Sequence, residues 1–118
     1  MRMSPTRAYT WFAGVGSFLQ GTSTLFTSII PHMIPSHSGL HIATGLIGFA
    51  TLRFGGSAGP RRFALWFGLF YTALAIAGPL SGHPLGLGLI PADNYIHAVL
   101  GGLGLLAVAV ESIRARAA

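Results

Sequence analysis

Four apolar stretches, each close to the length that crosses a lipid bilayer, constrain the fold of this chain more than any other feature. They cover residues 8–30, 37–54, 63–78 and 93–113, and about 20 apolar residues span a hydrocarbon core. Only 8% of the 118 residues are charged, which is too few to cover the surface of a water-soluble domain. The sequence therefore predicts an all-α polytopic membrane protein with four transmembrane helices.

The arginines predict how these helices are oriented. All seven lie before the first stretch, around the second connection or after the fourth stretch: Arg2, Arg7, Arg53, Arg61, Arg62, Arg114 and Arg116. Because arginine-rich segments stay in the cytoplasm, we expect both termini to be cytoplasmic. With no lysine in the chain, these cations form no clustered basic stripe, and we expect no nucleic-acid partner.

One motif, P-x5-H-x3-G-x2-G, occurs twice. The two copies are Pro35, His41, Gly45 and Gly48, and then Pro91, His97, Gly101 and Gly104. We interpret the chain as a single four-helix domain made by tandem duplication of a two-helix hairpin, with repeats at residues 1–54 and 55–118. Since both copies would start in the cytoplasm, a pseudo-twofold axis along the membrane normal should relate them.

In a helix, positions i, i+4 and i+7 share one face, so each histidine of the motif lies above a stripe of two glycines. We favour a packing role, in which Gly45, Gly48, Gly101 and Gly104 let helices approach closely and the imidazoles hydrogen-bond a neighbouring helix. The alternative is that the glycines clear room for haem or a chlorophyll-type pigment bound by His41 and His97. We predict no cofactor, and keep haem or (bacterio)chlorophyll as this alternative.

All five histidines fall toward the expected outer side: His32, His37, His41, His83 and His97. Imidazole suits zinc and copper, but the only close pair is His37 and His41, at i and i+4 across the expected start of the second helix. We therefore predict no metal site. The chain has no cysteine, no carboxylate pair and no nucleophile elbow, so we expect no catalytic residues and no enzyme activity.

The two acidic residues have structural interpretations. Asp93, two residues after Pro91, can cap the free amides at the start of the fourth helix and interact with its dipole. Glu111 lies three residues before Arg114, a spacing that predicts a pair on one helix.

Two further segments are unusual. The outer half of the first helix is polar, with Gln20, Thr22, Ser23, Thr24, Thr27 and Ser28, and its hydroxyls can bond carbonyls of their own helix or neighbouring helices. The connection over residues 79–92 is rich in leucine. Because such a loop should not stand in water, we expect it in the membrane interface or against another subunit.

The chain resembles a bacterial family of small four-helix membrane proteins known as domain of unknown function 4383. The resemblance covers nearly the whole chain. It is carried by the doubled motif, by Asp93-Asn94-x2-His97, and by Gly68-x2-Tyr71-x2-Leu74-x3-Gly78. Ser38 departs from it, because an asparagine matching Asn94 would be expected there. The resemblance implies the bacterial inner membrane, and no established activity, cofactor or catalytic residue.

These observations predict a non-enzymatic accessory subunit of a larger membrane complex, with the lipid bilayer and other subunits as partners. We expect a respiratory or photosynthetic complex because small helical subunits are common in that class, and not because particular residues indicate it. One alternative is an electron-transfer or light-harvesting subunit that uses His41 and His97. A further alternative is a small transporter or channel that uses the polar half of the first helix.

Overall fold

A computed structural model describes residues 2–31, 33–81 and 83–118. It contains helices α1 (Pro5–Phe26), α2 (Pro35–Phe54), α3 (Gly59–Ser81) and α4 (Pro91–Ala117), with one 3-10 turn, η1 (Pro84–Gly86), before α4. The residues that the structure describes form no strand. The prediction of an all-α fold with four helices is confirmed.

Two of the helices, α3 and α4, are long and apolar enough by length and composition to cross a membrane. The helices α1 and α2 do not meet the same criterion, because threonine, serine, glycine and histidine lower their apolar character.

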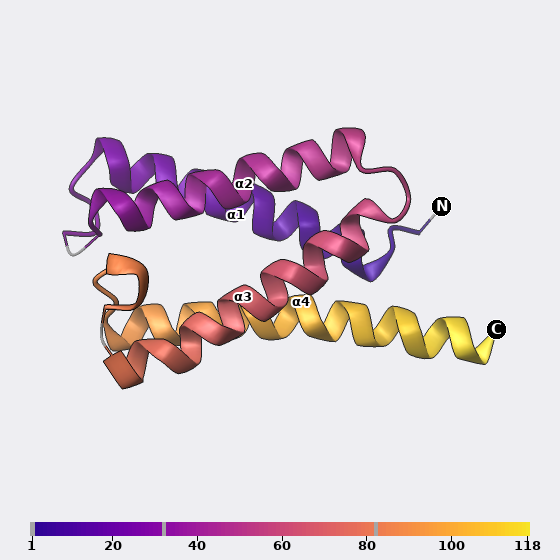
Figure 1. Cartoon of the computed structure of the whole chain (residues 1–118). Helices are drawn as coiled ribbons and strands as arrows, with labels where there is room; N and C mark the ends of the chain where they lie inside the picture. The colour runs from indigo at the N-terminus through magenta and orange to yellow at the C-terminus, as the bar shows by residue number, and fades with distance from the viewer. Residues whose placement is uncertain (1, 32, 82) are drawn as a thin grey trace.

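The helices form two antiparallel hairpins, α1 with α2 and α3 with α4, which pack against each other (Figure 1). Both termini lie at one end, together with the connection from α2 to α3 (Figure 1). We call this the arginine end, since it carries the described arginines of the first turn of α1, the last turn of α2, the start of α3 and the last turn of α4. The opposite end, formed by the connections after α1 and after α3, is called the histidine end.

Prolines define where the helices begin. Pro5, Pro35 and Pro91 occupy the first turns of α1, α2 and α4, where a missing amide hydrogen breaks no helical bond. As a result α2 begins at Pro35, two residues before the apolar stretch, and His37 and His41 lie together in its first two turns.

Glycines allow close contact within each hairpin. A Cβ atom on Gly45 of α2 would lie 2.8 Å from the Gly14 carbonyl oxygen and 2.6 Å from Phe18 Cβ of α1. In the second hairpin, a Cβ on Gly101 of α4 would lie 2.9 Å from the Gly68 carbonyl oxygen of α3. Larger side chains at these two positions would push the helices apart.

The two hairpins contact each other through two equivalent pairs, in each of which an aromatic ring of one hairpin lies against a glycine of the other. A Cβ on Gly104 of α4 would lie 2.9 Å from Tyr9 Cζ of α1, and a Cβ on Gly48 of α2 would lie 3.3 Å from Phe63 Cζ of α3. Tyr9 also donates a hydrogen bond of 2.8 Å to the Leu100 carbonyl. The aromatic ring of each hairpin thus fills the glycine gap of the other.

The leucine-rich connection between α3 and α4 folds back onto the protein. Leu87 and Leu89 are buried in the same apolar cluster as Tyr71, and Ser36 of α2 donates a hydrogen bond of 3.1 Å to the Gly86 carbonyl. Leu85 remains exposed. Part of the apolar character that we assigned to a lipid or subunit contact is therefore explained by packing within the chain.

Glu111 bonds across helices at the arginine end. Its Oε1 atom accepts hydrogen bonds from the Thr6 amide at 3.0 Å and the Thr6 hydroxyl at 2.7 Å, and Oε2 lies 3.7 Å from an Arg61 nitrogen. The carboxylate joins α4 to α1 and α3, a role that the spacing to Arg114 did not predict.

Candidate functional site

Three histidines meet inside the histidine end of the bundle. His37 and His41 lie in the first two turns of α2, and His97 lies in the second turn of α4. Each side chain is at most 1% exposed. Buried imidazoles are unusual in an apolar bundle unless they are hydrogen-bonded or bind a ligand.

The three rings converge through one kind of atom. Nε2 of His37 lies 3.2 Å from Nε2 of His41 and 3.4 Å from Nε2 of His97. One nitrogen from each ring lies within 4.8 Å of the other two. The geometry is that of a three-nitrogen ligand set.

Tyr71 of α3 forms the next wall of the cluster. Its ring stacks on His41 with 5.9 Å between centroids, and lies 5.3 Å from the ring of His97. The Tyr71 hydroxyl lies 2.6 Å from the Thr44 hydroxyl. Since Thr44 donates its own hydroxyl proton to the Leu40 carbonyl, Tyr71 is the donor in this contact. Tyr71 of α3 therefore links α2, through Thr44, with α4, through the ring of His97.

One carboxylate lies beside the cluster. Asp93 is 3% exposed and stands one turn before His97 on α4. Its Oδ2 atom accepts a hydrogen bond of 3.0 Å from the Ile90 amide, and its charge acts on both His41 and His97. Asp93 therefore lies both at the helix start and within the electrostatic range of the three imidazoles.

The structure brings some of the five histidines together and leaves one apart. His41 and His97, named as candidate cofactor ligands, face each other with 5.8 Å between ring centroids, and His37 joins them. His83 is exposed in the connection before α4. His32 lies outside the described residues.

Sequence reasoning missed two members of the cluster, His37 and Tyr71. The signal for His37 was present, because its spacing of four residues from His41 places both on one helix face once Pro35 is recognised as the helix start. Asp93 has the same spacing before His97. Tyr71 carried no comparable signal, since its approach to His41 depends on the crossing of the two hairpins.

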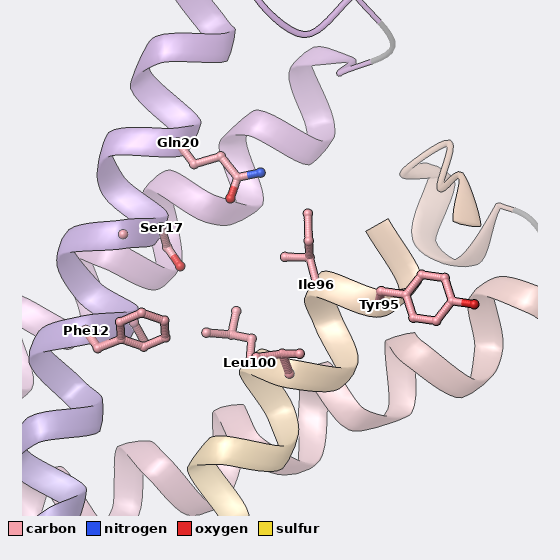
Figure 2. A pocket seen from close by; sticks show the side chains of 9 residues that line it. Phe12, Ser17, Gln20, Tyr95, Ile96 and Leu100 are labelled. Carbon is pink, nitrogen blue, oxygen red and sulfur yellow. The ribbon is translucent and has the colours of Figure 1, made fainter. Parts of the chain in front are cut away.

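A second feature is an apolar groove of about 350 Å³ between α1 and α4. Figure 2 shows Phe12, Ser17 and Gln20 of α1 facing Ile96 and Leu100 of α4 across it. Small residues of α1, Ala13 and Gly16, also line the groove. The groove opens on the outer surface of the bundle. Its lining residues include none of the three clustered histidines.

Comparison with known proteins gives no family for this chain. No family model, no curated protein and no solved structure matches it.

Proposed function

We propose that this chain is an integral membrane protein that crosses the bilayer four times, with both termini in the cytoplasm. The distribution of polar residues carries the proposal. The largest fully buried side chains are those of Tyr71, His37, His41, His97, Thr10, Thr44 and Ser38. Large apolar side chains are exposed on every helix, an arrangement that suits lipid and would be costly in water.

The shorter helices also suit a bilayer. At 1.5 Å per residue, the 20 residues of α2 extend for about 30 Å, which is the thickness of a typical hydrocarbon core. Exposed apolar residues on this helix include Leu46 and Ile47. The arginine end then faces the cytoplasm and the histidine end faces the opposite side. We propose the bacterial inner membrane as the location, which is what the resemblance noted in the sequence implies.

Labelling of single cysteines in intact cells tests this topology. Ser81 and Ala115 are exposed at opposite ends of the molecule, and the chain has no cysteine of its own. We expect a membrane-impermeant maleimide to label Ser81→Cys from outside, and to label Ala115→Cys only after the cells are opened. If only Ala115→Cys were labelled in intact cells, the orientation would be the reverse of the one proposed.

Within this topology we propose a non-enzymatic role as an accessory subunit of a larger membrane complex, respiratory or photosynthetic in class. The groove between α1 and α4 supports a partner helix as its occupant, because its walls are apolar and Gly16 allows close approach. Gln20 adds a hydrogen-bonding amide that a helix can satisfy and an acyl chain cannot.

Site-specific photo-crosslinking in membranes tests the subunit role. A photoreactive residue at Val99 lies in the groove, and one at Ile76 of α3 is exposed elsewhere on the bundle. We expect one defined protein adduct from position 99 and lipid adducts from position 76. Lipid adducts alone from position 99 would refute the partner helix and leave the topology untouched.

A further inference from the structure

The contacts among the three imidazoles cannot all be good hydrogen bonds. A neutral imidazole carries one proton and one lone pair on its two nitrogens. Nε2 of His37 is near Nε2 of both His41 and His97. If the two neighbours donate, they compete for the single lone pair of His37, and if His37 donates, its one proton must be shared. Hydrogen bonds between the rings can therefore fully satisfy only one of these two contacts of His37.

From this geometry we propose that His37, His41 and His97 bind one divalent transition-metal ion, of the zinc or copper class, through their Nε2 atoms. A zinc–nitrogen distance of about 2.0–2.1 Å implies about 3.3 Å between two nitrogens of a tetrahedral site. Two of the three nitrogen–nitrogen distances, 3.2 Å and 3.4 Å, match this value, and the third pair, His41 and His97, lies within 4.8 Å. Three imidazole nitrogens so close together can direct their lone pairs at one cation, which hydrogen bonds between the rings do not allow.

The positions of the ligands on their helices support the same assignment. His37 and His41 are spaced by four residues, the spacing by which two histidines of one helix bind a single zinc ion. His97 comes from α4, so the ion links the two hairpins. Three protein nitrogens leave a fourth position for water or a small ligand, as in catalytic zinc sites.

The surroundings compensate the charge of the ion. Asp93, buried beside the cluster, acts on His41 and His97, and Glu111, the other acidic residue, lies at the far end of α4. A carboxylate at this place offsets part of the charge that a divalent ion brings into a low-dielectric bundle. The ring of Tyr71 covers His41 and His97, and each of the three histidines is at most 1% exposed, so little bulk water reaches the cluster.

Metal titration of the purified full-length protein in detergent tests the proposal. The protein carries a purification tag without histidine, is stripped with a chelator, and is titrated with Zn²⁺ or with Co²⁺ as a visible probe. We expect one ion per chain, an absorption spectrum typical of tetrahedral Co²⁺, and at least tenfold weaker binding in each of H37Q, H41Q and H97Q. His83→Gln, which changes an exposed histidine, is the matched control and should bind as the wild type does.

X-ray absorption of the Zn²⁺-loaded wild type needs no substitution, and so decides the question even where a variant fails to fold. We expect three imidazole nitrogens at about 2.0 Å from the ion. Fewer than three imidazoles, no stoichiometric binding by the wild type, or an equal loss in H83Q would overturn the proposal. The test does not depend on membrane topology or on a partner subunit, so its failure is distinct from theirs.

Discussion

The phenol ring of Tyr9 occupies the space left by the missing side chain of Gly104, with Tyr9 Cζ 2.9 Å from the position of a Cβ at residue 104. Phe63 stands in the same relation to Gly48. The glycines of the repeated motif are therefore contact points both within each hairpin and between hairpins, which makes them sensitive to substitution.

Gly45→Leu and Gly101→Leu should each destabilise the protein by about 1–3 kcal/mol, because the added side chain overlaps Phe18 or α3 and forces the helices apart. Matched controls lie on the same two helices. Gly39 and Gly102 have open space where a side chain would stand, so G39L and G102L should change stability by less than about 0.5 kcal/mol. Unfolding in mixed micelles, followed by circular dichroism, measures all four; equal losses would contradict the packing role.

The hydrogen bond between Tyr71 and Thr44 predicts that replacing Thr44 destabilises the protein more than replacing Tyr71. Tyr71→Phe removes a donor and leaves Thr44 bonded to the Leu40 carbonyl, at a cost of about 0.5–1.5 kcal/mol. Thr44→Val removes the acceptor 2.6 Å from the buried Tyr71 hydroxyl and leaves Ser17 as its remaining side-chain partner, at a cost of about 1–3 kcal/mol. The double variant should lose less than the sum of the two. Additive losses would mean that the two hydroxyls do not interact. Thr22→Val, which changes a hydroxyl bonded to its own helix, is the control.

At the arginine end, Glu111→Ala should destabilise the protein more than Arg61→Ala. Removing the carboxylate leaves the buried Thr6 without the acceptor of its amide and hydroxyl, which costs about 1–3 kcal/mol. The side chain of Arg61 is 46% exposed, so loss of the ion pair changes stability by less than about 1 kcal/mol. The free energies of unfolding of the two variants give the comparison. A greater loss in Arg61→Ala would show that the ion pair dominates.

The absorption spectrum of the purified protein should contain neither a Soret band nor a chlorin band. The centroid of the His37 ring lies 5.0 Å from that of His41 and 5.4 Å from that of His97. The ring of Tyr71 also contacts both His41 and His97. A porphyrin held by both imidazoles would need the space that these rings fill. A Soret or chlorin band that disappears in His41→Ala or His97→Ala would favour the cofactor alternative instead.

Local sequence patterns were sufficient to predict the helices. Apolar stretches bounded by Pro35, Pro60 and Pro91 predicted the number of helices and most of their starts, because helix formation depends on short-range spacing and on the missing amide of proline. The repeated motif also identified the glycines that lie at the contacts, since close packing of helices needs small residues at fixed intervals.

The identity of the site depended on contacts that no local pattern encodes. Tyr71, Glu111 and His97 meet partners more than 25 residues away, and these meetings follow from how the hairpins cross. The groove is another example, because it exists only where Ala13 and Gly16 of α1 lie opposite Val99 of α4. The sequence by itself determined the helices, their order and their arginine-rich end. Only the tertiary structure decided that three imidazoles share one centre, because the direction of a side chain is set by helix packing and not by its place in the chain.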